Sequence, residues 1–209
     1  MTFRLTKIDE LTRPDHYHLD ESDNCYFFGE YTARKSFSHS ETNQLILNLK
    51  KGNDKRGSYE YRYKGIAIQK VADLITSTIN NLNDFTFVPV PPSKCNTDLA
   101  YDDRITAILK LCQQVNRSFE FREIITQRQS MEASHNSIAR PTPAEIAANY
   151  QFNQVLTAGV RNNIVIFDDV LTAGSHYKAM KDTIRHYLPN VGVIGLFVAR
   201  TARDSEWLD

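Results

Sequence analysis

The strongest constraint on the fold is a short segment near the end of the chain, where an apolar run leads directly into two carboxylates and a loop of small residues. Residues 164–167 read Ile-Val-Ile-Phe, Asp168 and Asp169 follow, and residues 170–175 read Val-Leu-Thr-Ala-Gly-Ser. A wholly apolar run with β-branched residues is typical of a parallel strand that is covered on both faces. The segment therefore predicts a buried strand that ends at the acidic pair.

The residues after this loop predict a helix and then a second strand. The apolar positions of the helix fall on one stripe: Met180, Ile184, Tyr187 and Leu188. Pro189 and Asn190 end the helix, and residues 191–198 are expected to form the next strand. A strand, a helix and a second strand make up the crossover unit from which parallel sheets are built.

The order of these side chains also has a chemical meaning. A loop of Thr, Ala, Gly and Ser lets backbone N–H groups approach an anion, and the N-terminal end of the following helix adds positive charge. Asp168 and Asp169 offer acceptors for the adjacent hydroxyls of a ribose. The segment fits a 5-phosphorylated ribose, and the alternative is a plain strand end with a solvated acidic pair before an ordinary helix.

These residues resemble the signature of the type I phosphoribosyltransferases, in which a hydrophobic strand is followed by Asp-Asp, two apolar residues and a Thr-Ala-Gly loop. The resemblance implies that Asp168 and Asp169 bind the 2- and 3-hydroxyls of 5-phosphoribosyl-1-pyrophosphate. It implies a 5-phosphate loop made of Thr172, Ala173, Gly174, Ser175 and His176. The imidazole at position 176 stands where the family usually has Thr or Ser, and it can also donate to phosphate.

The order of segments over about residues 25–202 is similar to that of the ComF-like phosphoribosyltransferases. It comprises an apolar run ending at residues 50–51, a helix from about residue 65, a Val-Pro-Val-Pro strand at residues 88–91 and the acidic strand. Those relatives generally begin with paired cysteines that bind zinc. Cys25, Cys95 and Cys112 are isolated in this chain, so no zinc site is implied.

The chain departs from these relatives after the Val-Pro-Val-Pro strand. The relatives carry an Arg-Gly-containing segment near the pyrophosphate, whereas residues 99–103 read Leu-Ala-Tyr-Asp-Asp here. The change removes a cation and adds two acids, which bears on catalysis more than on binding. Ser93, Lys94 and Arg104 are the expected pyrophosphate contacts, because this loop lies at the carboxyl edge of a sheet strand.

Residues 126–141 are polar and show no clear period. In type I phosphoribosyltransferases a mobile loop in this part of the chain covers the active site, and the resemblance makes Arg128, His135 and Arg140 the candidate contacts from such a lid. An ordinary surface loop is an equal alternative. The sequence Thr-Pro-Ala-Glu at residues 142–145 predicts a capping box and a short helix.

Apolar spacing predicts the remaining elements. Helices are expected over residues 65–81 and 98–116, strands over 85–90 and 119–125, and a strand or hairpin over 26–37. Cys112 falls on the apolar stripe of the second of these helices, so we expect a core residue there rather than a nucleophile.

Two local clusters have competing interpretations. His16, His18 and Asp20 resemble a metal-binding group, although a solvated N-terminal segment is the favoured interpretation. The basic turn at residues 50–56 could steer a phosphorylated ligand, although a solvated loop is again favoured.

The whole chain agrees with one intracellular domain. Its 209 residues suit a single α/β domain, with a small hood over about residues 1–40 and a core over about 41–202. The fold that the resemblance implies has a parallel sheet of about four or five strands with helices on both faces. Lys and Arg number 25, as do Asp and Glu, which argues against a broad nucleic-acid or membrane surface. With no apolar stretch near the ~20 residues of a membrane helix and no signal sequence, the cytoplasm is expected.

The expected reaction is transfer of phosphoribosyl to a nitrogen acceptor with release of pyrophosphate. Magnesium would be bound through the oxygens of the phosphoribosyl pyrophosphate rather than by the protein directly. The alternatives are a non-catalytic sensor of this ligand or of a nucleotide, and a ComF-like accessory protein of nucleic-acid uptake. The acceptor is not identified by the sequence, and the resemblance implies a homodimer.

Overall fold

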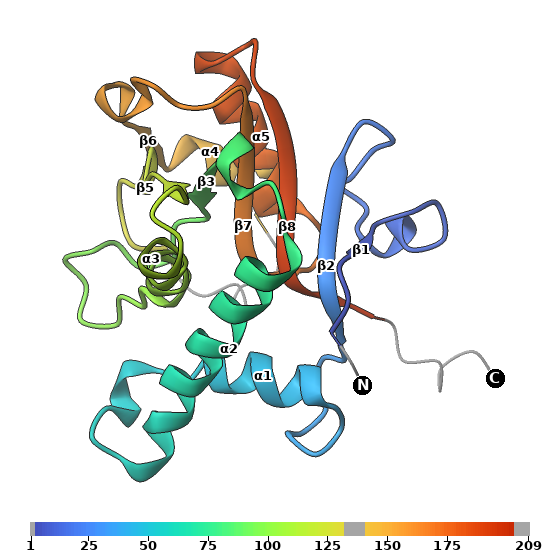
Figure 1. Ribbon diagram of the computed structural model, residues 1–209, viewed down its shortest axis with the longest axis vertical. Helices are drawn as coiled ribbons and strands as arrows, with labels where there is room; N and C mark the ends of the chain where they lie inside the picture. The colour runs from blue at the N-terminus through green and yellow to red at the C-terminus, as the bar shows by residue number, and fades with distance from the viewer. Residues whose placement is uncertain (1–2, 132–140, 203–209) are drawn as a thin grey trace.

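The computed structural model describes residues 3–131 and 141–202, and a six-stranded sheet forms its centre (Figure 1). The strand order is β1-β2-β8-β7-β3-β4, in which β2, β8, β7, β3 and β4 run parallel and β1 joins the edge antiparallel. The strands span Thr6–Lys7 (β1), Asn24–Tyr31 (β2), Phe85–Pro89 (β3), Glu120–Phe121 (β4), Asn163–Leu171 (β7) and Gly192–Thr201 (β8). The predicted α/β class with a mostly parallel sheet is confirmed.

Helices cover both faces of this sheet. One face packs against α1, α2 and α3, and the other packs against α4, α5 and a two-stranded antiparallel hairpin of β5 and β6. The bounds are Glu41–Leu49 (α1), Arg62–Thr78 (α2), Arg104–Val115 (α3), Pro143–Ala148 (α4), Ser175–Tyr187 (α5), Ile125–Gln127 (β5) and Tyr150–Phe152 (β6). Short 3-10 helices span Arg13–Asp15, Asn53–Lys55, Tyr59–Tyr61, Leu82–Asp84 and Gln154–Thr157. No helix in the described part of the chain has the length and apolar character needed to cross a membrane.

The central strand β7 is buried on both faces, as its apolar run predicts. Ile164 and Ile166 pack in the same core cluster as Met180 of α5, while Val165 and Phe167 pack in the cluster that α1, α2 and α3 complete. Burying one large apolar side chain contributes roughly 1.5–3 kcal/mol, so a two-sided strand of this kind is a major source of stability. The predicted unit of β7, α5 and β8 is confirmed by the parallel pairing of the two strands.

Helix α3 begins at Arg104, six residues later than its apolar spacing predicts. Acidic side chains hold the preceding residues in turns. Asp98 Oδ1 accepts from the Ala100 N–H at 2.9 Å, and Asp102 Oδ1 accepts from the Arg104 N–H at 3.2 Å. Such local side-chain bonds compete with helix formation. Cys112 is fully buried in α3, which confirms its predicted place in the core.

The single strand expected over residues 119–125 is wrong. Only Glu120 and Phe121 pair with β3, and the chain then leaves the sheet to begin the separate hairpin strand β5 at Ile125. The chain leaves the sheet at Arg122, whose guanidinium donates to the carbonyls of Leu156 (3.0 Å) and Ala158 (2.6 Å). These partners are distant in sequence, so local patterning could not reveal the break.

The N-terminal residues contribute to the central sheet. β2 pairs in parallel with β8 over Asn24–Tyr31, which confirms a strand in the predicted 26–37 region. Cys25, Phe27 and Phe28 of this strand are buried. Part of the expected hood over residues 1–40 therefore lies within the core of the fold.

Candidate functional site

The acidic pair lies near the carboxyl end of β7, at the edge where parallel strands of α/β sheets present their ligand sites. β7 continues to Leu171 because β8 offers it a partner at Arg200, so the strand does not end at the pair as the sequence predicts. Asp168 is partly exposed, whereas Asp169 is buried with 4% of its surface accessible. The two carboxylates therefore have different surroundings although they are adjacent in sequence.

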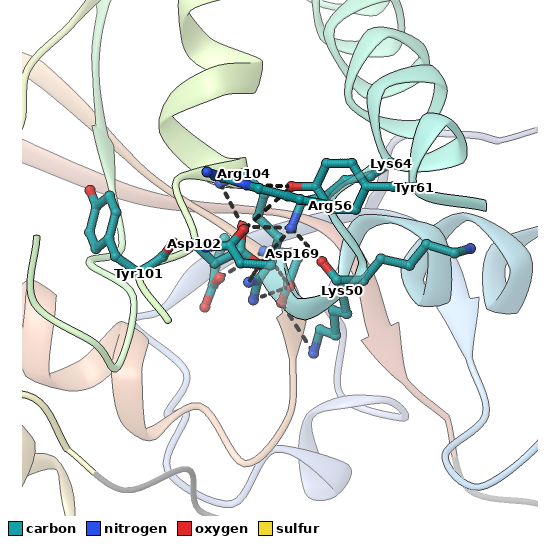
Figure 2. A network of polar contacts seen from close by, with 11 residues as sticks. Lys50, Arg56, Tyr61, Lys64, Tyr101, Asp102, Arg104 and Asp169 are labelled. Atoms are coloured by element: carbon teal, nitrogen blue, oxygen red, sulfur yellow. Dashed lines mark hydrogen bonds and ion pairs between the residues drawn. The ribbon is translucent and has the colours of Figure 1, made fainter. Parts of the chain in front are cut away.

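Asp169 is held by two cations from distant parts of the chain (Figure 2). Its Oδ2 accepts from Nε and from a terminal nitrogen of Arg104, each at 2.8 Å. The Lys50 Nζ lies 3.5 Å from Oδ1. Arg104 comes from the first turn of α3, and Lys50 from the C-terminal end of α1. Of the predicted pyrophosphate contacts, Arg104 is thus placed against the acidic pair itself.

A second carboxylate extends this network. Arg104 also contacts Asp102 Oδ2 at 2.8 Å, and both Asp102 oxygens accept from the buried Lys64 Nζ at 2.8 Å. Three cations, Arg104, Lys50 and Lys64, thus face Asp169 and Asp102, and the neighbouring Asp168 balances the remaining positive charge when it is ionised. The site carries a net positive charge only while Asp168 is protonated.

The two carboxyls of the acidic pair have pKa values shifted in opposite directions. Burial, and next the charge of Asp169, raise the pKa of Asp168 to about 7. Burial opposes ionisation of Asp169 as well, but Arg104 and Lys50 lower the pKa of that carboxyl to about 2. Asp169 therefore stays ionised at neutral pH, whereas Asp168 gains or loses its proton near pH 7.

This difference predicts a pH-dependent effect of replacing Asp168 with Asn. Between the ordinary carboxyl pKa of 3.8 and about 7, the folded chain keeps a proton on Asp168 that the unfolded chain has lost. The contribution of Asp168 to the free energy of unfolding therefore falls as pH rises through this window. We expect the stability of Asp168→Asn relative to wild type to increase between pH 4.5 and pH 7.5 in urea unfolding. A pH-independent difference would show that Asp168 has an ordinary pKa.

The predicted phosphate loop, residues 172–176, joins β7 to α5. Thr172 is exposed, Ser175 and His176 are partly exposed, and Ala173 and Gly174 are buried. Gly174 precedes the helix with a φ of 90°. The first N–H groups of a helix have no partner within the helix, and they carry its positive end. Burial lowers the pKa of His176, so its imidazole is a neutral donor or acceptor at this position.

An N-terminal segment, residues 16–23, packs against the phosphate loop. His16 is fully buried with its Nδ1 against the Thr172 carbonyl, and the His18 N–H donates to the Ala173 carbonyl at 3.0 Å. Asp23 is buried between Lys178, at 2.7 Å, and Lys181 of α5. The favoured prediction of a solvated segment is therefore wrong, because these contacts join residues that are about 150 positions apart.

Gly174 is expected to resist substitution by Ala. Its positive φ is unfavourable for residues with a Cβ, and a Cβ there would lie 3.0 Å from Leu19 Cδ2. We expect Gly174→Ala to lower the free energy of unfolding by about 1–3 kcal/mol, measured by urea denaturation. Gly65→Ala is the matched control, because Gly65 lies in α2 with open space around it and Ala favours a helix. Equal stabilities for the two variants would contradict this interpretation.

A cavity of about 460 Å³, here called the edge cavity, opens beside the end of β3. Its lining includes Pro91, Lys94, Glu123, Gln127 and Arg128. The Val90 N–H donates to the Phe167 carbonyl at 2.9 Å, so the cavity begins one strand away from Asp168. Its volume is within the range of small-molecule sites. The structure thus brings together the predicted pyrophosphate contact Lys94 and the predicted lid residue Arg128.

The other predicted contacts are placed elsewhere. Arg104 is paired with the acidic pair, and the Ser93 carbonyl accepts from the Met131 N–H at 2.7 Å. Arg140 and His135, the remaining lid candidates, lie outside the described residues. The first residues of the expected loop, 126–127, belong to the strand β5.

Lys64 and Asp102 are site residues that sequence reasoning did not assign a binding role, and Lys50 was only an alternative contact for a phosphorylated ligand. Lys50 follows the apolar run of α1 in a basic turn for which a solvated loop was the favoured prediction. Asp102 lies in the acidic segment of residues 99–103, which differs from the Arg-Gly segment of the ComF-like relatives. Its charge was expected to oppose pyrophosphate. The pairing with Lys64 and Arg104 neutralises that charge.

The carboxylate oxygens of Asp169 are already committed to neighbouring cations. Among the residues that the structure describes, no group of three or more His, Cys, Asp or Glu side chains is arranged to hold a metal ion. Magnesium keeps several oxygen ligands that are not from protein, which suits coordination by the oxygens of a phosphorylated sugar.

Comparisons with known proteins add no assignment to this geometry. The chain matches no protein-family model, and no curated protein is significantly similar to it.

Proposed function

We propose that this chain is a phosphoribosyltransferase of type I fold that binds 5-phosphoribosyl-1-pyrophosphate and transfers its phosphoribosyl group to a nitrogen acceptor, releasing pyrophosphate. One observation supports this more than any other: the acidic pair, the phosphate loop and the edge cavity adjoin one another along one edge of a parallel sheet. A sugar with a phosphate at one end and a diphosphate at the other needs three such regions. A cytoplasmic location is part of the proposal, since the described cysteines are all free thiols.

The ribose hydroxyls are assigned to the acidic pair, with Asp168 as the more accessible carboxylate. Asp169, fixed by Arg104 and Lys50, provides a permanent negative charge beside it. The 5-phosphate is assigned to the backbone N–H groups of residues 172–176 and to the exposed Thr172 hydroxyl. Arg104 and Lys50 offset part of the negative charge of the acidic pair beside the ligand.

The reaction would proceed through a positively charged sugar, so the chain acts mainly by orientation and electrostatics. A nitrogen on the acceptor forms a bond to C1 of the sugar as the bond from C1 to the pyrophosphate oxygen breaks. The carboxylates of the acidic pair would stabilise positive charge on a sugar bound beside them. Magnesium, when bound, neutralises the pyrophosphate as it leaves.

A sensor that binds the same ligand without turnover is the second candidate. The observation that favours it is the pairing of Arg104 with Asp169 and Asp102, which commits this cation to the acidic pair rather than to the edge cavity.

The experiment that separates these candidates is an assay of pyrophosphate release. The chain is incubated with 5-phosphoribosyl-1-pyrophosphate and magnesium, with and without a panel of nucleobases and amines. Release that depends on one acceptor supports the transferase. Binding without release under any acceptor supports the sensor, and absence of binding contradicts both.

A further inference from the structure

A turn in the N-terminal part of the chain, residues 16–19, holds the phosphate loop by its carbonyl groups. The His16 Nδ1 contacts the Thr172 carbonyl, and the His18 N–H donates to the Ala173 carbonyl at 3.0 Å. The ring of His16 is fully buried, so water does not compete for its contact. Two consecutive carbonyls of the phosphate loop therefore have a fixed direction.

The direction of each carbonyl also fixes the direction of the next N–H group. A trans peptide unit is planar, and its C=O and N–H bonds point to opposite sides. The described residues contain no cis peptide bond. The N–H groups of Ala173 and Gly174 therefore point away from the turn that holds the loop, and no described residue accepts a hydrogen bond from either of them. Successive N–H groups that point to one side of a loop form a concavity that binds anions.

The contact to Thr172 defines the tautomer of His16. A carbonyl oxygen can only accept a hydrogen bond, so Nδ1 carries the ring proton. Nε2 is then unprotonated, and it has no hydrogen-bond partner among the described residues. Burial lowers the pKa of His16 against the opposing effect of the Thr172 contact, and of the nearby charges Arg200 lowers this pKa while Asp15 raises it. The imidazole therefore stays neutral at pH 7 and keeps one tautomer.

The segment that carries His16 is anchored a second time, at its other end. Asp23 is buried between Lys178, at 2.7 Å, and Lys181, and both lysines belong to α5. These ion pairs do not involve the imidazole. Replacing His16 therefore removes the side-chain contact to the loop while the segment stays attached to the helix that follows the loop.

We propose that His16 is a positioning residue for the ligand: its imidazole donates from Nδ1 to the Thr172 carbonyl and so keeps the N–H groups of the phosphate loop turned toward the 5-phosphate. This inference rests on the proposed function and adds to it a residue that lies outside the phosphoribosyltransferase signature. His16 itself does not contact the ligand, because its ring is fully buried. Its effect on binding is transmitted by the peptide between Thr172 and Ala173.

The test is calorimetric titration of the full chain and its variants with ribose 5-phosphate. His16→Leu removes the donor, whereas His16→Asn keeps an amide donor near the position of Nδ1. We expect His16→Leu to bind ribose 5-phosphate on the order of tenfold more weakly, as for one lost hydrogen bond, and His16→Asn to bind more tightly than His16→Leu. His18→Ala is the matched control and should bind as wild type does, because His18 contacts the loop through its backbone N–H, which Ala retains.

The order of the two His16 variants separates positioning from a merely structural role. Burying the amide of Asn costs more free energy than burying the side chain of Leu. If His16 only stabilised the fold, His16→Leu would bind ribose 5-phosphate at least as tightly as His16→Asn. That order, or an affinity of His16→Leu equal to that of wild type, would overturn the inference and leave the proposed function standing.

A measurement on the wild-type chain decides the question if a variant does not fold. In nitrogen-15 NMR at pH 7, His16 should show a protonated Nδ1 and an unprotonated Nε2, and ribose 5-phosphate should shift the amide resonances of Ala173 and Gly174. The opposite tautomer, or binding that leaves both amides unshifted, would overturn the inference alone. If wild type binds neither ribose 5-phosphate nor 5-phosphoribosyl-1-pyrophosphate, the proposed function fails and the inference fails with it.

Discussion

Replacing Asp168 with Asn is expected to weaken binding of 5-phosphoribosyl-1-pyrophosphate by more than about a hundredfold, because charge-assisted hydrogen bonds contribute about 1.5–3 kcal/mol each and two are lost. Asn has nearly the same shape, and its amide oxygen can still accept from the Asp169 N–H, as Asp168 Oδ1 does at 2.8 Å. The variant should therefore fold. Calorimetric titration with magnesium present measures the change in affinity.

Asp182→Asn is the matched control for this prediction. Asp182 is an exposed carboxylate of α5, outside the phosphate loop and the acidic pair. The control should bind like wild type. If Asp168→Asn also retained wild-type affinity, the ribose would not be bound at this carboxylate.

Replacing Asp169 with Asn should act on the fold. Asp169 is buried, and Arg104, with 21% of its side chain exposed, donates to it twice. Removing one member of a buried ion pair leaves the other charge without compensation, and the typical cost is about 3–5 kcal/mol. Because Arg104 keeps Asp102 as a second partner, we expect a loss of about 3 kcal/mol in the free energy of unfolding.

Urea denaturation at pH 7 measures this loss, with Asp103→Asn as the control at an exposed carboxylate of the same region. The control should change the free energy of unfolding by less than about 0.5 kcal/mol. An equal effect of the two variants would mean that the Asp169–Arg104 pair contributes nothing to stability. A double replacement of the acidic pair would mix lost binding with lost stability, so the single variants are the informative ones.

The parts of the structure that the sequence predicts well are governed by local rules. The apolar run of residues 164–167 can only be buried on both sides, and β7 is indeed central. Thr142 and Glu145 form the predicted capping box at the start of α4, because both bonds lie within four residues. The predicted apolar stripe of α5 is confirmed at Met180 and Ile184, which are fully buried, whereas Tyr187 of the same stripe is exposed.

The arrangement of the candidate site depends on contacts that no local pattern contains. Arg104 reaches Asp169 over 65 positions, and Lys64 reaches Asp102 over 38. The sequence gives Lys64 no role, and it assigns Arg104 to pyrophosphate rather than to Asp169. The environment of the acidic pair could therefore be identified only from the folded structure. The same holds for the pairing of Gln127 with Tyr150 between β5 and β6.

The proposed function requires the chain to bind a phosphoribosyl ligand. Calorimetric titration of the wild-type protein with 5-phosphoribosyl-1-pyrophosphate and magnesium tests this directly. We predict saturable binding with one ligand per chain, weakened when magnesium is removed. A folded sample that releases no heat of binding at any ligand concentration, and whose melting temperature the ligand does not raise, would contradict the assignment of the acidic pair and the phosphate loop.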